Sequence, residues 1–267
     1  MKKKAGMRRT PDETAVWRAS VKSKGAEKNR KKRVEIDVSV IIPAYNEEKY
    51  IGACFASLKR QKFSGTYEII LGDGMSTDNT QKIARSYGAR VVEEHYGTPS
   101  GGRHAAAKVA RGNVFAFVSA DVEVSPGWIE GIYDAFLDRR VAWSVGRIKP
   151  FNGNALEEAG ALVLNVFAAF LNRTGIAYVN ADNLAVRASA YWKCGGFDPK
   201  MVTSEDTDLG KRLMRCGRFA FAKDACALLS MRRVRKWGYL RFVIFHTSNF
   251  FMTHLFSSPA ERYDPVR

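Results

Sequence analysis

A short apolar run followed by an amphipathic helical pattern recurs four times between Val38 and Leu137, and this alternation constrains the fold more than any other feature. The apolar runs are residues 38–42, 67–71, 89–93 and 114–118. Strands that alternate with helices form parallel βαβ units, in which helices cover both faces of the sheet. The sequence therefore predicts an α/β protein with a Rossmann-like, mostly parallel sheet.

The fourth apolar run is followed by two acids, Asp121 and Glu123. Open α/β sheets bind their ligands at the carboxyl ends of the strands. Acids at i and i+2 on an extended chain point the same way, and such oxygen ligands suit Mg²⁺ or Mn²⁺ better than zinc. We therefore predict a divalent-cation site here, and the alternative is an ordinary polar turn after a strand.

The positive charge is concentrated at the start of the chain. Residues 1–33 hold 13 Lys and Arg against three acids, a net charge of +10 out of +16 for the whole chain. This segment has too few large apolar residues to fold alone, which predicts a disordered basic arm. The arm either attracts anionic lipid or nucleic acid or is simply solvated. We expect no secretory signal, because no apolar stretch follows the charges.

The cysteines and histidines indicate neither a disulfide framework nor a zinc site. Four cysteines lie inside apolar patterns without CxxC spacing, which is typical of reduced core thiols in a cytoplasmic protein. The four histidines are too scattered for zinc. These residues are Cys54, Cys194, Cys216, Cys226, His95, His104, His246 and His254.

The second half of the chain is less regular. A helix is expected over residues 155–172 and is apolar almost all round, so it lies in the core or against a membrane; we expect the core. The aromatic segment 238–256 is interrupted by Arg241, His246, Asn249 and His254, so it falls short of a transmembrane span, and its polar residues lie on all sides of a helical wheel. Glu205 and Asp206 begin another expected helix, where capping alone would account for acids.

Taken in order, five motifs resemble the family-2 glycosyltransferases with the GT-A fold. The matching stretches are VIIPAYNE at residues 40–47, IILGDGMSTD at 69–78, GGRHAAA with ARG at 101–112, SAD at 119–121, and GGFD at 195–198 followed by Glu205-Asp206. The resemblance runs from about residue 38 to about residue 217. It implies a GT-A domain over residues 34–230, between the basic arm of residues 1–33 and a basic, helical and aromatic C-terminal extension over residues 231–267.

The resemblance also implies a role for each matching residue at the donor site. Pro43, Tyr45 and Glu47 stand where such enzymes hold the base and ribose of the nucleotide. Asp73 stands where a carboxylate pairs with the base, and Arg103 matches an arginine near the nucleotide.

The two remaining motifs imply the metal site and the catalytic base. Asp121 would hold a divalent ion, Mg²⁺ or Mn²⁺, that bridges the diphosphate of the donor. Asp206 would be the catalytic base, with Glu205 as the other member of the acidic pair.

Two positions depart from the family pattern. Ser119 replaces the first acid of the Asp-x-Asp metal motif, and Glu123 is the residue expected to restore a ligand. Residues 233–237 (RVRKW) only loosely resemble the Gln-x-x-Arg-Trp element of processive members. Processive polymer synthesis is therefore not expected.

The expected reaction is transfer of a sugar, with inversion, from a nucleotide-diphosphate sugar to a hydroxyl group. A divalent cation and arginines would stabilise the leaving diphosphate, and a carboxylate would activate the hydroxyl. The basic arm, the apolar helix and the aromatic segment suit a saccharide or lipid-linked saccharide at the cytoplasmic face of the membrane. We therefore expect a cytoplasmic protein in peripheral contact with that face.

Three alternatives remain open from the sequence. A polyprenyl phosphate acceptor already carries its charge and would need little help from a base. A nucleic-acid-binding protein is supported by the basic arm alone, with no recognisable reading module. A dinucleotide-binding domain would need a glycine-rich first turn, where this chain has Pro43.

Overall fold

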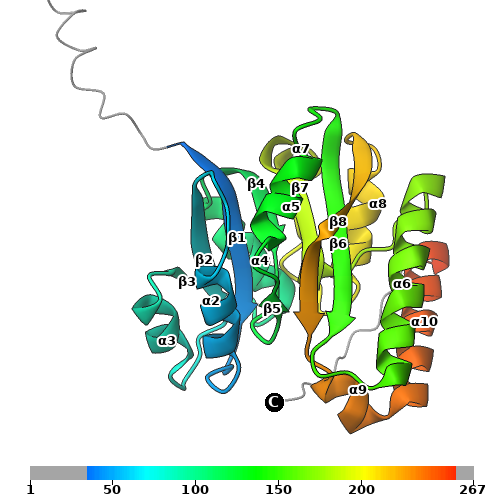
Figure 1. Cartoon of the computed structure of the whole chain (residues 1–267), viewed down its shortest axis with the longest axis horizontal. Coiled ribbons are helices and arrows are strands. Elements are labelled where there is room, and N and C mark those ends of the chain that lie inside the picture. The colour runs from blue at the N-terminus through cyan, green and yellow to red at the C-terminus, as the bar shows by residue number, and fades with distance from the viewer. Residues whose placement is uncertain (1–34, 257–267) are drawn as a thin grey trace, which may run out of the picture. The chain divides into compact units, whose positions relative to one another are not determined.

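The computed structural model describes residues 35–256, and its folded unit begins at Ile36 (Figure 1). The basic arm predicted over residues 1–33 and the last part of the predicted C-terminal extension, residues 257–267, lie outside the described residues. Eight strands form a single sheet in the order β3-β2-β1-β4-β7-β6-β8-β5. Helices cover both of its faces, which confirms the predicted α/β architecture.

The four predicted strands form the parallel half of this sheet. They are β1 (Ile36–Ala44), β2 (Tyr67–Asp73), β3 (Arg90–Glu93) and β4 (Gly112–Phe117). The helices that follow the first three are α2 (Ile51–Lys59), α3 (Thr80–Ser86) and α4 (Pro99–Val109). Because these strands are parallel, their carboxyl ends and the turns after them lie at one edge of the sheet.

The other half of the sheet is mixed. It contains β5 (Glu123–Val124), β6 (Val141–Pro150), β7 (Leu184–Arg187) and β8 (Arg218–Leu229), with α5 (Trp128–Ala135) packed on β8. The strand β7 runs antiparallel to β4 and β6, whereas β6 and β8 are parallel. Four of the seven strand pairs among the described residues are therefore parallel, and β5 and β8 were not anticipated from the sequence.

Residues on both faces of the sheet are buried in two apolar clusters. Val40 and Ile42 of β1 pack in one cluster with Phe55 of α2, whereas Ile41 packs in the other with Tyr191. A strand that is buried on both faces reads as a continuous apolar run, which explains why β1 and β4 are recognisable from sequence alone.

Six further elements complete the described part of the chain, residues 35–256. They are α6 (Ala155–Thr174), the 3₁₀ turn η1 (Ala181–Asn183), α7 (Ala188–Lys193), α8 (Glu205–Leu213), α9 (Arg232–Trp237) and α10 (Tyr239–Phe256). Figure 1 shows α6 and α10 side by side. Hydrogen bonds agree: Tyr239, at the start of α10, donates to Glu157 of α6 at 3.1 Å and accepts from the Asn154 side chain at 3.0 Å.

The expectation that the apolar helix lies in the core was wrong. Of the twenty residues of α6, only Glu157, Ala168, Leu171 and Asn172 are buried. Leu162, Val163, Val166 and Phe170 are each 60–65% exposed. Of the described helices, α6 alone is long and apolar enough to cross a membrane by length and composition. Sequence periodicity cannot separate the two cases, because a helix that is apolar all round suits either environment.

Candidate active site at the carboxyl edge of the sheet

The turns after β1 and β2 are joined by hydrogen bonds. The backbone N–H of Asn46 donates to Ser76 Oγ at 2.9 Å, and the N–H of Glu47 donates to Thr80 Oγ1 at 2.8 Å. The Asn46 side chain accepts in return from the N–H of Thr77 at 2.8 Å. Asn46 has a φ of 54°, a left-handed conformation that asparagine tolerates better than most residues. These bonds fix the positions of Tyr45 and Glu47, two of the predicted donor-binding residues.

The predicted base-recognition residue Asp73 is buried at the end of β2 and serves the same turn. Its carboxylate accepts from the N–H of Ser76 at 2.8 Å, from Ser76 Oγ at 2.6 Å and from Gln81 Nε2 at 2.7 Å. Three donors satisfy most of the acceptor capacity of a carboxylate. In the structure Asp73 therefore stabilises the turn after β2. Its contact with the base of the nucleotide stays a prediction.

Helix α4 approaches the sheet so closely that only glycine fits at the contact. A Cβ on Gly72 would lie 2.0 Å from the carbonyl oxygen of Gly102, and one on Gly102 would lie 3.0 Å from Pro43 Cβ. Thr98 caps the helix by accepting from the N–H of Gly101 at 2.8 Å. The two glycines thus bring the first turn of α4, and with it Arg103, against the ends of β1 and β2.

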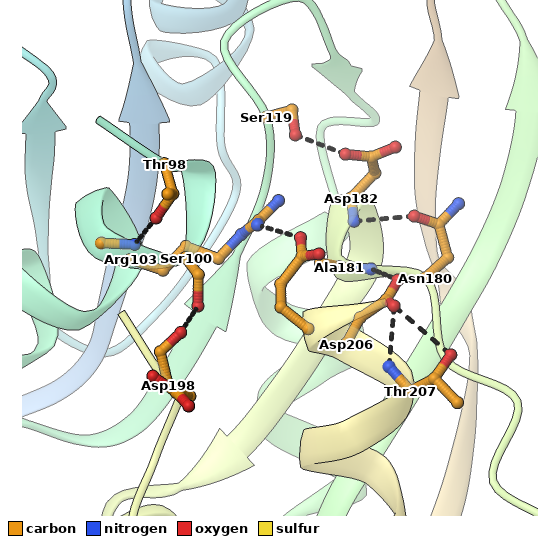
Figure 2. Close-up of polar contacts among 12 residues, drawn as sticks. Thr98, Ser100, Arg103, Ser119, Asn180, Ala181, Asp182, Asp198, Asp206 and Thr207 are labelled. Atoms are coloured by element: carbon orange, nitrogen blue, oxygen red, sulfur yellow. Dashed lines mark hydrogen bonds and ion pairs between the residues drawn. The ribbon is translucent and has the colours of Figure 1, made fainter. Parts of the chain in front are cut away.

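The loop before α8 is tied to the same first turn of α4. Thr98 Oγ1 donates to the carbonyl of Pro199 at 2.7 Å. Ser100 Oγ donates to the carbonyl of Asp198, as Figure 2 shows. The loop that leads into α8 is therefore held against the N-terminal end of α4, although about a hundred residues separate the two in sequence.

This arrangement pairs Arg103 with the predicted catalytic acids. Arg103 Nη1 lies 2.7 Å from Glu205 Oε1, and their side chains are 5% and 13% exposed. Asp206 accepts from the N–H of Thr207 at 2.7 Å and from the N–H of Ala181 at 3.3 Å (Figure 2). Burial and the charge of Glu205 raise the pKa of Asp206, and Arg103 opposes that rise. A carboxyl with a raised pKa is better matched to accept a proton near neutral pH.

Asp121 and Glu47 are brought together by Arg232, a residue that the sequence analysis did not single out. Arg232 Nε lies 3.0 Å from Asp121 Oδ2, and Arg232 Nη2 lies 2.8 Å from Glu47 Oε1. The guanidinium also lies 4.3 Å from the ring centre of Tyr50. Burial and the nearby charge of Asp182 raise the pKa of Asp121 to about 6, although Arg232 acts in the opposite direction.

Asp182, also missed from sequence, lies beside the position that departs from the metal motif. Ser119 Oγ donates a hydrogen bond to Asp182 Oδ1 (Figure 2). The signal for Asp182 is visible only after β4 and β7 are paired. The sequence signal for Arg232 is the basic stretch that contains it, but the motif comparison covers residues 233–237 and begins one residue after Arg232.

Glu123 is directed to another partner. It lies in β5, and its Oε2 is 3.7 Å from Arg60 Nη2. The thiol of Cys54 is affected by both acids: burial raises its pKa, and the charges of Asp121 and Glu123 add to the rise. Metal binding by Glu123 stays a prediction.

The chemistry of the site fits a divalent cation bound together with a phosphate group. Asp121 supplies hard oxygen ligands. Beside it, Glu47 Oε2 and Arg232 Nη1 are buried without a hydrogen-bond partner among residues 35–256, which indicates groups whose partner belongs to a ligand. No three His, Cys, Asp or Glu side chains in this part of the chain are arranged to hold a metal by themselves. Mg²⁺ is often held by one or two carboxylates, with substrate phosphates and water completing the shell.

The aromatic helix α10 contacts the residue before the acidic pair. Asn249 Nδ2 donates to Ser204 Oγ at 2.6 Å, and Lys211 Nζ of α8 donates to the carbonyl of Thr253 at 3.1 Å. Ser204 is the N-cap of α8 and has a φ of 55°. The C-terminal segment therefore helps to position the start of α8.

Comparison with known proteins identifies a family and relatives of similar sequence. The family model described as Glycosyl transferase family 2 matches residues 39–195. Glycosyltransferase AglE of Haloferax volcanii is 25% identical over 198 residues, which are 70% of this chain and 64% of that protein. Poly(ribitol-phosphate) beta-N-acetylglucosaminyltransferase TarS of Staphylococcus aureus is 38% identical over 90 residues, 31% of this chain and 16% of TarS. The chain thus spans less than two thirds of the length of these relatives.

Solved structures share the fold. The crystal structure of S. aureus TarS in complex with UDP-GlcNAc aligns with a TM-score of 0.63 and 22% identity, covering 73% of this chain and 58% of that one. The mannosyltransferase PcManGT from Pyrobaculum calidifontis, in complex with GDP-Man and Mn²⁺, aligns with a TM-score of 0.63 and 18% identity, covering 93% and 75%. The expected GT-A fold is therefore confirmed.

Proposed function

Because this chain belongs to glycosyl transferase family 2, we propose that it transfers a sugar from a nucleotide-diphosphate sugar to a hydroxyl group on a saccharide or lipid-linked saccharide, with inversion at the anomeric carbon. The observation that carries the proposal is the position of Asp206. Its carboxylate, with a raised pKa, lies at the start of α8 beside the Arg103–Glu205 pair. Relatives of similar fold are in complex with UDP-GlcNAc or GDP-Man, which supports a donor of that class.

Each residue of the site has its own role in the proposed reaction. Asp206 accepts the proton of the acceptor hydroxyl, and the hydroxyl oxygen then attacks the anomeric carbon from the face opposite the leaving diphosphate. Attack from that face inverts the configuration. Arg103 and Arg232 supply positive charge where the diphosphate leaves. A divalent cation, Mg²⁺ or Mn²⁺, would add charge there when bound, held by Asp121.

A polyprenyl phosphate is the second candidate acceptor. The exposed apolar surface of α6 favours it, because such a substrate resides in a membrane. A phosphate oxygen is already ionised, so transfer to it would not require Asp206. The two acceptors are separated by the Asp206→Asn variant, which should lose transfer to a hydroxyl and retain transfer to a phosphate.

Peripheral attachment to the cytoplasmic face of the membrane is part of the same proposal. Exposed apolar side chains lie on α6 and on α10, where Leu240, Val243 and Leu255 are 57–75% exposed. Arg173 of α6 and Arg241 of α10 are also exposed and would attract anionic lipid. The four cysteines form no disulfide, which suits a reducing compartment.

The test is a donor screen with the purified full chain. UDP-, GDP-, ADP-, CDP- and dTDP-sugars are each incubated with Mn²⁺ or Mg²⁺, with and without a lipid extract, and released nucleoside diphosphate is measured. We expect release with one donor class, and stimulation by lipid extract. If circular dichroism shows that the protein is folded and no donor yields nucleoside diphosphate, sugar transfer by this chain is refuted.

A further inference from the structure

Ser119, two residues after β4, and Asp182, two residues before β7, meet at the end of this antiparallel strand pair. In this ladder Val114 lies opposite Arg187, and Phe117 lies opposite Leu184. The same register, continued two residues past Phe117, places Ser119 opposite Asp182. Directly opposite residues have Cβ atoms about 4.5–5.5 Å apart. The carboxylate of Asp182 therefore stands beside the place that an acid at position 119 would occupy.

The turn that carries Asp182 is held in place by hydrogen bonds of two nearby residues, Asn180 and Asn183. Asn180 accepts from the N–H of Asp182 at 2.9 Å. The next residue, Asn183, is buried; its Oδ1 accepts from Trp128 Nε1 at 2.8 Å, and its Nδ2 donates to the carbonyls of Arg147 at 2.9 Å and Ala225 at 3.0 Å. A ligand side chain held by such supports keeps its geometry before the ligand arrives.

We propose that Asp182 replaces the acid missing at Ser119 and, together with Asp121, holds the divalent cation of the sugar-transfer reaction. This inference rests on the proposed function. Both residues supply hard oxygen ligands, and two carboxylates leave the rest of the coordination shell to diphosphate oxygens and water. Ser119 engages one oxygen of Asp182 and so orients the other.

Glu123 is the rival for this role, because it follows Asp121 by two residues. Its carboxylate contacts Arg60 at 3.7 Å, an exposed arginine at the C-cap of α2. Asp182, in contrast, is hydrogen-bonded to Ser119 itself. The register of the sheet and this hydrogen bond both favour Asp182 as the replacement.

The experiment titrates Mn²⁺ against the full chain and follows the electron paramagnetic resonance signal of free Mn²⁺, first with the metal alone and then with UDP or GDP. Asp182→Asn should weaken Mn²⁺ binding about tenfold or more, since loss of an outer-shell partner alone typically costs about that much. The exchange variant Ser119→Asp with Asp182→Ser returns the acid to the motif and should restore binding. Asp224→Asn, an exposed acid of β8, is the matched control and should leave binding unchanged.

Three results would overturn the assignment: unaltered Mn²⁺ binding by Asp182→Asn, loss of binding in Glu123→Gln instead, or no Mn²⁺ binding by the unmodified chain under any condition. Thermal unfolding of each variant shows that it is folded. The third result would refute the metal site but would not show whether the chain transfers sugar. The donor screen, repeated in EDTA, tests sugar transfer separately.

Discussion

Arg103 and Glu205, which are separated by 102 positions in sequence, form an ion pair of 2.7 Å whose two side chains are nearly closed to solvent. The pair joins Arg103, the fifth residue of α4, to the first residue of α8. The ion pair fixes Glu205, and it therefore also helps to set the position of the next residue, Asp206.

Removal of one partner of this pair should be costly. Arg103→Gln leaves the Glu205 carboxylate buried without its cation, which should lower the free energy of unfolding by about 3 kcal/mol. Urea denaturation measures the change. The double variant Arg103→Gln with Glu205→Gln should recover much of the loss, since position 205 then carries no unpaired buried charge. A double variant no more stable than Arg103→Gln would show that the pair is not the source of the loss.

The pH dependence of transfer should report the groups around Asp206. The base works only when ionised, so kcat/KM should fall as the pH drops through its raised pKa. Glu205→Gln removes the charge that raises this pKa and should move the acid limb to lower pH. Arg103→Gln removes the charge that lowers it and should move the limb to higher pH. Shifts of the same sign in both variants would contradict the assignment.

Asp206→Asn should separate catalysis from donor binding. Loss of a general base typically costs about 10²–10⁴-fold in rate, and the amide preserves the shape of the side chain. Turnover on a hydroxyl acceptor should fall by about that factor, while nucleoside diphosphate binding, measured by calorimetry, stays close to that of the unmodified chain. Asp224→Asn serves as the control. Near-normal turnover by Asp206→Asn would assign the base elsewhere.

The contact between Gly72 and Gly102 predicts a matched pair of glycine variants. Gly72→Ala drives a methyl group to 2.0 Å from a backbone oxygen, which should lower the free energy of unfolding by about 3 kcal/mol or prevent folding. Gly52, within α2, has no atom within 4 Å of its would-be Cβ. Gly52→Ala should therefore raise the free energy of unfolding by about 0.5–1 kcal/mol. Chemical denaturation compares the two, and equal effects would refute the close approach.

The exposed face of α6 should determine binding to lipid. Leu162→Glu with Phe170→Glu places two charges on this face, where the native side chains are 65% and 60% exposed. Binding to anionic vesicles, measured by co-sedimentation, should be strongly reduced. Leu137→Glu changes a residue that is 64% exposed elsewhere and should have no effect. Equal vesicle binding by all three proteins would exclude α6 as the attachment surface.

The sequence predicted the parallel half of the molecule well, and the reason is local. The strands β1, β2 and β4 carry runs of buried residues, whereas β3 is only partly buried. Each of the four apolar runs is followed by a helical pattern, so the signal is complete within a short stretch. The site was predicted where motifs end such strands, as at Asp73 and Asp121. Asp182 and Arg232 were missed because their place depends on pairings with distant strands and turns, and no local pattern encodes an antiparallel register.

The hydrogen bond between Glu47 and Arg232 joins positions 185 apart. Glu47 lies in the first turn of the fold, whereas Arg232 emerges from the ribosome long afterwards. Contacts within the parallel half close short loops and can form early, but this contact must wait for nearly the whole described chain. A nascent chain that stops before residue 232 would lack the cation beside Asp121 and Glu47, so the candidate site is complete only after residue 232 has been synthesised.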